Sequence, residues 1–305
     1  MTEQDDAREA AEKLGRNNLL AIAAMIAAAF FYLIGDSVVK LTTEHLPVPQ
    51  IIMLRGLMTS VLVAAAAAAT GAFSGWRHLF DRPVVARSAF DGITTLLIVN
   101  ALAHMAIADA TAVINSVPIV ATLLAVVILR EQVGFRRWAA VLVGFVGVLM
   151  VLRPSGESFN EYGLLAFAAT LTIAGRDIVT RKIAAEVPSL IVTLASAIFV
   201  GLTGAVVAVV FGSWTQPDTT DLVMIAAAAC ALFGAYHYSV VAIRLGEVSL
   251  TAPFRYSVIL WGLIVGYLVW GDVPGIMSLA GMVLITLAGL YVFHRERLAR
   301  QRARP

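Results

Sequence analysis

The sequence predicts an all-α integral membrane protein with ten transmembrane helices, arranged as two inverted repeats of five helices. Three observations support this prediction: an apolar composition, ten apolar stretches of membrane-crossing length, and residue pairs that recur at one constant offset. Of the 305 residues, 60% are hydrophobic and 14% are charged. A water-soluble domain carries about 25% charged residues, so the chain is too apolar for a soluble protein.

Ten apolar stretches have the length that crosses a bilayer, because about 20 apolar residues span a hydrocarbon core of about 30 Å. The links between them are short and rich in Pro, Gly and charged residues, which leaves no room for a soluble domain. Backbone polar groups inside a bilayer must be satisfied within their own segment, so the stretches are expected to be helices. The predicted spans are 18–40, 47–70, 84–106, 110–129, 135–152, 160–182, 188–211, 220–243, 248–270 and 275–293.

Residue pairs 141 positions apart indicate that the chain contains one unit twice. Pairs near the beginning of the unit and pairs near its end have the same offset, so the whole unit is repeated. They are Asp36/Asp177, Lys40/Arg181, Pro47/Pro188, Glu131/Asp272, Gly134/Gly275, Ala139/Ala280, Leu149/Leu290 and Val151/Val292. Internal repeats set the architecture of a chain. The expected segments are a cytosolic start at 1–17, repeats at 18–153 and 154–294, and a basic cytosolic tail at 295–305.

The basic residues predict the orientation, because Lys and Arg concentrate in cytoplasmic segments. With the N-terminus inside, 17 of the 22 basic residues fall in inside segments, 2 fall outside and 3 lie within spans (17 + 2 + 3 = 22). The two outside are Lys40 and Arg153. Both termini are therefore expected in the cytosol of a bacterium, with the protein in its inner membrane. The acidic, helix-prone start is expected to be a cytosolic helix and not a cleaved signal peptide. Five spans per unit, an odd number, make the second copy inverted.

The motifs of enzymes and cofactor sites do not occur in the sequence. It contains no HExxH, no GxSxG and no Gly-rich phosphate loop, which argues against a membrane enzyme. The single cysteine, Cys230, excludes a disulfide framework or a cysteine-based metal site. We therefore expect no catalytic residues, no metal, no cofactor and no nucleic-acid partner.

Inverted repeats favour a secondary transporter, since many such proteins place a substrate site between two inverted halves and expose it to either side by rocking. A passive channel, a receptor, or a duplicated structural or lipid-interacting membrane protein remains the alternative class. A small-molecule substrate and membrane lipid are the expected partners, with a proton or a counter-substrate as candidate co-partners. The sequence leaves monomer and homodimer open.

Three stretches resemble the EamA type of the drug/metabolite transporter superfamily. They are ADATAVINSVPIVATLLAVVILRE at 108–131, LGEVSLTAPFRYSVILWGLIVGYLVWGD at 245–272, and Tyr32 to Lys40 followed by PVPQIIMLRG at 47–56. The resemblance extends over about 18–294. It implies a cavity ringed by spans 1, 3, 4, 6, 8 and 9, with spans 5 and 10 at the periphery. It also implies alternating-access transport of a small organic metabolite, either amino acid-like or vitamin- or nucleoside-like, such as riboflavin or S-adenosylmethionine.

Polar side chains inside the spans are the candidate substrate-binding or gating residues, because an ionisable group in a membrane is costly and marks a pathway or a pair. A rise of about 1.5 Å per residue places them in two layers. The outer layer contains Asp36, Arg55, His104 and Asn115, and the inner layer contains Asp91, Arg176, Asp177, His237, Arg255 and Tyr256.

Each layer holds an acid and a base, so each can form an ion pair that either gates the pathway or braces the helices. Two arginines at one depth, Arg176 and Arg255, suit an anionic, zwitterionic or planar substrate. His104 and His237 are candidates for proton relay, since imidazole titrates near neutral pH. The candidate pairs are Asp36–Arg55 in the outer layer and Asp177–Arg255 or Asp91–Arg176 in the inner layer.

Several further residues have expected structural roles. Pro118 and Pro253 are expected to loosen their helices. Glu131 and Asp272 are expected to be solvated charges that brace loops. Small residues in spans 5 and 10 are expected to let helices approach closely.

Overall fold

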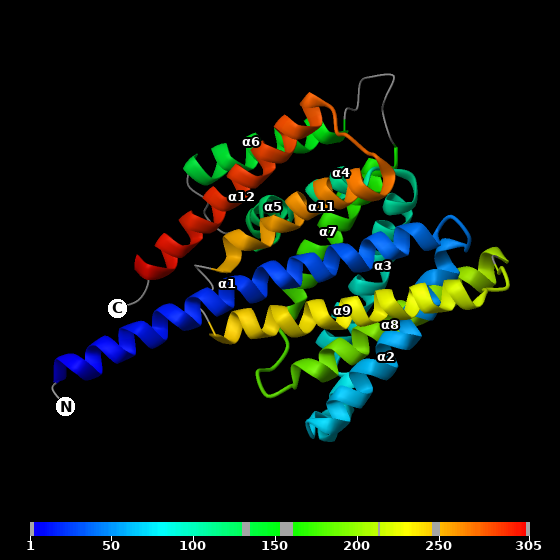
Figure 1. Cartoon of the computed structure of the whole chain (residues 1–305), viewed down its shortest axis with the longest axis horizontal. Coiled ribbons are helices and arrows are strands. Elements are labelled where there is room, and N and C mark those ends of the chain that lie inside the picture. Colours follow the sequence, from blue (N-terminus) through cyan, green and yellow to red (C-terminus); the bar gives the residue numbers. More distant parts are fainter. Residues whose placement is uncertain (1–2, 130–134, 153–160, 213, 246–250, 303–305) are drawn as a thin grey trace.

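A computed structural model describes residues 3–129, 135–152, 161–212, 214–245 and 251–302, and within these ranges every regular element is a helix (Figure 1). The prediction of an all-α protein is confirmed. The elements are α1 (Glu3–Thr42), α2 (Val48–Ala69), the 3₁₀-helix η1 (Ala72–Phe80), α3 (Arg82–His104), α4 (Ile107–Ile114), α5 (Val117–Leu129), α6 (Phe135–Leu152), α7 (Tyr162–Thr180), α8 (Ser189–Phe211), α9 (Thr219–Leu245), the 3₁₀-helix η2 (Ala252–Tyr256), α11 (Ser257–Val265), the π-helix η3 (Gly266–Trp270) and α12 (Ile276–Arg302).

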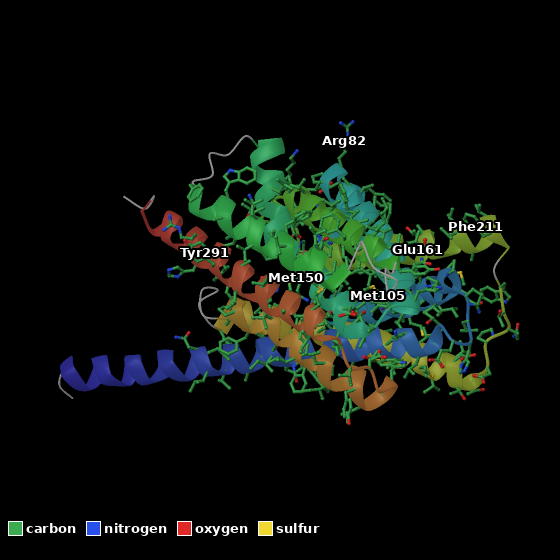
Figure 2. All side chains as sticks on the ribbon, turned by 90° about the horizontal axis from the view of Figure 1, so that it is seen from above. Arg82, Met105, Met150, Glu161, Phe211 and Tyr291 are labelled. Atoms are coloured by element: carbon green, nitrogen blue, oxygen red, sulfur yellow. The ribbon has the colours of Figure 1, made fainter. Side chains whose placement is uncertain are left out.

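The helices agree with ten membrane spans. Among the described residues, nine helical stretches are long and apolar enough to cross a membrane, and Trp138–Leu152 within α6 is a shorter apolar helix. The expected helix at the start of the chain is continuous with the first span, because α1 runs unbroken from Glu3 to Thr42. Its N-terminal part extends beyond the other helices in both views (Figures 1 and 2).

The fourth span is broken where the sequence places Pro118. α4 ends at Ile114, and α5 begins at Val117, so the proline occupies the first turn of α5, where its missing N–H costs little. Local side chains satisfy carbonyls at the break: Asn115 Nδ2 donates to the Thr111 carbonyl at 2.8 Å, and Ser116 Oγ donates to the Val113 carbonyl at 2.6 Å. The loosening expected at Pro118 is therefore a two-residue turn, Asn115 and Ser116, between α4 and α5.

The ninth span is also irregular. It begins with the 3₁₀-helix η2, which contains Pro253, and ends with the π-helix η3. Gly271 closes it with a left-handed backbone, φ 69°, a conformation that glycine adopts without steric cost.

The helix pairs follow the pattern that a duplicated unit predicts. α1 packs along α9, α3 along α7, α2 against α8, and α6 against α12 (Figure 1). The 141-residue offset relates α1 to α7 and α3 to α9, so the first two contacts are equivalent to each other. The other two contacts each join a helix to its own counterpart. The inverted orientation of the two halves stays a prediction.

Glycines allow the closest of these approaches. A Cβ placed on Gly56 of α2 would lie 2.5 Å from Gly201 Cα of α8, and one on Gly204 would lie 2.4 Å from the backbone nitrogen of Met53. No side chain fits at such separations, so the α2–α8 crossing needs glycine. Small residues have this role in membrane helix pairs generally.

The helices α6 and α12 lie together at one edge of the molecule (Figure 1). Leu142 on α6 and Val283 on α12 are among the large apolar side chains that stay exposed, at 60% and 56%. The main apolar core lies behind them, between α4, α6, α7, α11 and α12, and includes Ile107, Val148 and Ile285. This placement agrees with the expectation that spans 5 and 10 are peripheral.

Candidate functional site

A cluster of charges joins α3 to α7 near the N-terminal end of α3, the end predicted to face the cytosol. Asp91 accepts from two arginines: Arg87 Nη1 lies 2.9 Å from Asp91 Oδ2, and Arg176 Nη1 lies 3.2 Å from Asp91 Oδ1. Arg176 also reaches its neighbour Asp177, with Nη2 2.9 Å from Oδ1. We call Arg87, Asp91, Arg176 and Asp177 the inner cluster. It contains the predicted Asp91–Arg176 pair.

Hydrogen bonds extend the inner cluster to α8. Arg87 Nη1 donates to Ser196 Oγ at 2.5 Å, and Arg87 Nε donates to Thr180 Oγ1 at 3.2 Å. The side chains of Arg87 and Asp91 are only 12% and 10% exposed. Three helices are therefore held together by one largely buried guanidinium.

Sequence reasoning missed Arg87, which was counted among the basic residues of the inside segments. The structure places it in the second turn of α3, one turn before Asp91. The signal was present, since residues four apart lie on the same helix face and an opposite-charge pair at this spacing is favourable.

A second ion pair lies further along the spans, and we call it the outer pair. Arg55 Nη1 on α2 is 4.0 Å from Asp36 Oδ1 on α1, with the two side chains 10% and 37% exposed. The predicted Asp36–Arg55 pair is therefore present. The distance is too long for a hydrogen bond, so this contact is looser than those at Asp91.

Tyr236 on α9 lies between the outer pair and the inner cluster. It is within electrostatic range of Arg55 on one side and of Arg176 on the other. Its ring also lies near that of Tyr32 on α1, with centroids 6.2 Å apart. Tyr236, which is not among the candidate residues predicted above, is thus near both the outer pair and the inner cluster.

Arg255 does not occupy the place that the sequence suggested. The alternative Asp177–Arg255 pair is absent among the described residues, where Asp177 pairs with Arg176 instead. Arg255 lies exposed on η2, within electrostatic range of Tyr32. One acid, Asp91, is instead shared by two cations, Arg87 and Arg176.

Three of the predicted residues lie away from these charges. His104 stacks on Tyr162, with ring centroids 3.9 Å apart, at the far end of α3. Asn115 caps α4, as described above. Tyr256 turns towards the peripheral helix α12, where a Cβ on Gly289 would overlap its hydroxyl. A helix position predicts depth but not direction, so residues of similar depth can point to different neighbours.

His237 follows Tyr236 on α9 but does not share its face. Successive helical residues are turned by about 100°, and the His237 side chain is exposed. Its ring packs edge-on against Tyr238, with centroids 5.5 Å apart. A proton relay through His104 and His237 would need the two rings close together, and the structure places them in separate regions.

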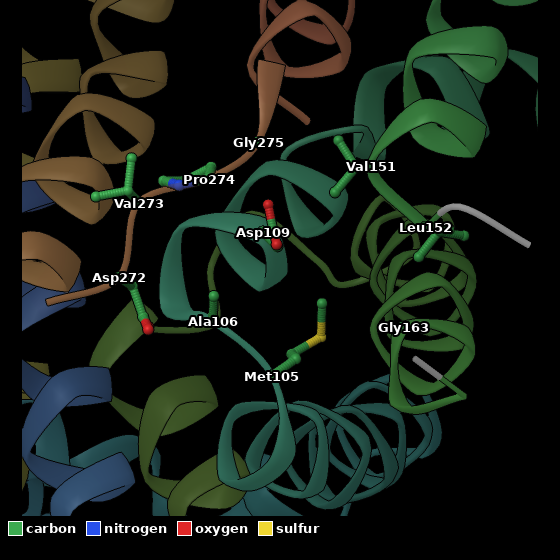
Figure 3. A pocket seen from close by; sticks show the side chains of 10 residues that line it. All are labelled: Met105, Ala106, Asp109, Val151, Leu152, Gly163, Asp272, Val273, Pro274 and Gly275. Atoms are coloured by element: carbon green, nitrogen blue, oxygen red, sulfur yellow. The ribbon is translucent and has the colours of Figure 1, made fainter. Parts of the chain in front are cut away.

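A pocket lies at the opposite end of α3 and α7 from the inner cluster (Figure 3). Its volume is about 260 Å³, and Ser278 donates a hydrogen bond to Asp109 at its wall. Asp272, expected to be a solvated loop charge, faces this pocket, whereas Glu131 lies outside the described residues. The lining residues are Met105, Ala106, Asp109, Val151, Leu152, Gly163, Asp272, Val273, Pro274 and Gly275.

Lys40 connects α1 to the rim of this pocket. Its Nζ donates to the Met105 carbonyl at 2.5 Å and lies 5.3 Å from the Trp270 ring centroid. It is also within electrostatic range of Asp272. Lys40 thus ties the predicted outer end of α1 to the α3–α4 link and to the end of η3. The sequence identified it only as an outside basic residue.

Comparison with known proteins identifies the first repeat. Residues 19–153 match the EamA-like transporter family. The matched segment is called the EamA-like unit below, for its similarity to that family. Its limits agree with the predicted repeat at 18–153, and the predicted family resemblance is confirmed.

Relatives of the chain include three transporters with different named substrates. The chain is 26% identical over 191 residues to an S-adenosylmethionine uptake transporter of Rickettsia prowazekii, covering 63% of this chain and 64% of that protein. It is 25% identical over 195 residues to a riboflavin transporter of Vibrio cholerae, covering 63% and 64%. It is 22% identical over 271 residues to a pseudopaline exporter of Pseudomonas aeruginosa, covering 86% and 92%. The matches thus span just under two thirds of the first two relatives.

A solved structure supports the fold over nearly the whole chain. A protein crystal structure superposes with a TM-score of 0.63 at 18% identity, covering 93% of this chain and 98% of the other. The agreement extends beyond the EamA-like unit at 19–153 and therefore includes the second half of the chain.

Proposed function

We propose that the chain is a secondary transporter that moves a small organic metabolite across the bacterial inner membrane by alternating access. The main support is a set of charged side chains that lie within spans yet remain exposed. Asp36 is 37% exposed, Arg176 25% and Asp177 50%. A charge facing lipid would cost several kcal/mol by most estimates, so these groups face a water-filled space between the helices.

The proposed cavity lies where the two halves meet. Tyr32 and Asp36 come from the first repeat, whereas Arg176, Asp177 and Tyr236 come from the second. A substrate site near the interface of two repeats is typical of secondary transporters. The EamA-like unit and the transporter relatives support the same function.

The inner cluster is the proposed closed gate. It connects α3, α7 and α8 near the ends predicted to face the cytosol, so these helices cannot separate until Arg87 and Arg176 release Asp91. Opening of the gate would replace the contacts among α3, α7 and α8 with contacts to water and would expose the cavity to the cytosol. The termini are proposed to lie on this same side, as the distribution of basic residues predicts.

The positive balance of the cavity favours a substrate with an anionic group. Among the described residues, Arg255 has no acidic partner, while each acid of the inner cluster already pairs with an arginine. A carboxylate, a phosphate or a polarised carbonyl of the substrate would supply the partner that Arg255 lacks. The proposed substrates are amino acid-like, vitamin-like or nucleoside-like, and S-adenosylmethionine and riboflavin are the first probes because relatives are named for them.

Counterflow in proteoliposomes tests this function. Vesicles loaded with unlabelled S-adenosylmethionine, riboflavin or a panel of amino acids should take up the same labelled compound faster than empty vesicles, with saturation. A thermal-stability screen of purified protein against the same compounds selects the probes. Flux that rises linearly with concentration and is unaffected by the internal compound would support a passive channel instead.

A further inference from the structure

Asp36 differs from the other acids of the cavity in how it is held. Within the described part of the chain, its carboxylate has one cationic partner, Arg55, at 4.0 Å, and its side chain is 37% exposed. Asp91 has two partners at 2.9 and 3.2 Å, and Asp177 takes two hydrogen bonds from Arg176 at 2.9 and 3.1 Å. Charge-assisted hydrogen bonds are strong, so protonating Asp91 or Asp177 would sacrifice two of them. Protonating Asp36 sacrifices none.

We propose that Asp36 is a proton-binding site that couples proton movement to the movement of a substrate carrying an anionic group, with Arg55 as the residue that binds both Asp36 and that group. This inference rests on the proposed transport function and adds a driving force to it. The proton and the substrate anion are predicted to bind together and to move in the same direction.

The surroundings of Asp36 leave Arg55 as its controlling partner. Of the charged groups on the elements around α1, Arg55 is the one in ion-pair contact with Asp36 in the described structure. Tyr236 reaches Asp36 only through Arg55, with which it is in electrostatic range. The other titratable groups on those elements and near the outer end of α1 are Arg82, Arg87, Asp91 and His104 on α3, Asp221, Cys230, His237, Tyr238 and Arg244 on α9, Arg255 and Tyr256 on η2, Tyr267 on η3, and Tyr32, Lys40 and His45 on or next to α1.

The coupling follows from the burial of Arg55. A proton from the solution on the open side forms an O–H bond with one carboxylate oxygen of Asp36, while Arg55 keeps all its protons. The guanidinium, 10% exposed, then lacks its counter-charge, which favours the binding of another anionic group beside it. A carboxylate or phosphate of the substrate can supply that charge. On the other side the anion leaves, Asp36 releases the proton to water, and the original pair forms again.

Protonation of Asp36 and binding of the anionic group must strengthen each other equally, which would make the protein a cotransporter of a proton and the substrate. If protonation of Asp36 tightens anion binding, anion binding must favour protonation by the same factor. One linked proton can change the apparent affinity by at most about tenfold per pH unit. An acidic exterior should therefore drive anionic substrate into the vesicle or cell.

The test uses full-length protein in proteoliposomes with the membrane potential clamped, and labelled S-adenosylmethionine as a carboxylate-bearing probe. With the wild-type protein, an outside pH one unit below the inside pH should raise the steady-state accumulation of the probe up to about tenfold. Asp36→Asn should keep measurable exchange, because the amide resembles the protonated acid, but should lose the accumulation driven by the pH gradient. Glu186→Gln removes a negative charge from the exposed α7–α8 link and should behave as wild type.

An infrared measurement detects protonation of Asp36 directly and does not depend on the transported probe. Lowering the pH of reconstituted wild-type protein should produce the C=O stretch of a protonated carboxyl, which Asp36→Asn should lose and Glu186→Gln should keep. Saturable counterflow without an Asp36 carboxyl band, or without an effect of the pH gradient, would overturn the inference and leave the transport function intact. Absence of counterflow for every probe would overturn both.

Discussion

The inner cluster and the outer pair occupy related places in the two repeats but are built differently. The offset of 141 relates Asp36 to Asp177 and Arg55 to Ser196. In the outer pair, one arginine meets one acid at 4.0 Å. In the inner cluster, the position equivalent to Arg55 is Ser196, which accepts a hydrogen bond from Arg87 on a different helix. The first repeat thus carries a loose pair of its own, whereas the closely bonded cluster forms where α3 of the first repeat meets α7 and α8 of the second.

This difference separates two tasks that a transporter must perform. A gate has to hold helices together until it is released, which suits the multiple short contacts of Asp91. A coupling site has to change its charge during the cycle, which suits the single long contact of Asp36. The predictions below test whether the two regions differ in strength as their geometry indicates.

The largest expected effect is at Asp91. Replacing it with Asn leaves Arg87 and Arg176 close together and largely buried without their shared counter-charge, and breaking such a pair costs about 3–5 kcal/mol. Thermal unfolding of the detergent-solubilised protein should show a large fall in midpoint. The matched control is Asp177→Asn, whose side chain is half-exposed and which should cause a much smaller change. Equal effects would contradict the assignment of Asp91 as the centre of the cluster.

Arg255 tests whether the cavity binds an anionic group outside both regions. Arg255→Gln should weaken binding of a carboxylate-bearing substrate by about 1.5–3 kcal/mol, the usual contribution of a hydrogen bond to a charged group, with little effect on unfolding. Arg255→Lys should restore only part of the affinity, because a point charge lacks the bidentate guanidinium geometry. Isothermal titration would measure this, and wild-type affinity in the Gln variant would remove Arg255 from the site.

Ser196 tests the connection of the inner cluster to α8. Ser196→Ala removes the acceptor for Arg87 and should lower the free energy of unfolding by about 1 kcal/mol. Thr193→Ala on the same helix is the control, because that exposed hydroxyl bonds to the carbonyl of Ser189 within α8. If both variants have the same stability, the Arg87–Ser196 contact contributes nothing measurable.

The smallest expected effect is the coupling energy between Asp36 and Arg55. A double-mutant cycle with Asp36→Asn and Arg55→Gln should give less than about 1 kcal/mol, because the distance is long and the acid is partly solvated. The same cycle on Asp91 and Arg176 should give a clearly larger value. Equal coupling energies would remove the contrast between the two regions.

The sequence by itself determined the membrane class, the ten spans, the repeat offset and the family resemblance. Each of these is a property of residues along the chain: hydropathy over about 20 positions, a constant spacing, and short motifs. It also identified two of the ion pairs that join residues of different spans, Asp36–Arg55 and Asp91–Arg176. Depth could be counted because each helical residue advances by a constant rise.

Only the tertiary structure decided which way each side chain points. Rotation of a helix about its axis relative to its neighbours brought Arg87 to Ser196 and Thr180 and set Tyr236 within electrostatic range of both Arg55 and Arg176. The same factor turned Tyr256 towards Gly289. These rotations depend on close packing against distant segments, such as the Gly56–Gly201 crossing. No local pattern in the chain encodes that angle, so the sequence predicted the depth of the charges but not the full set of their partners.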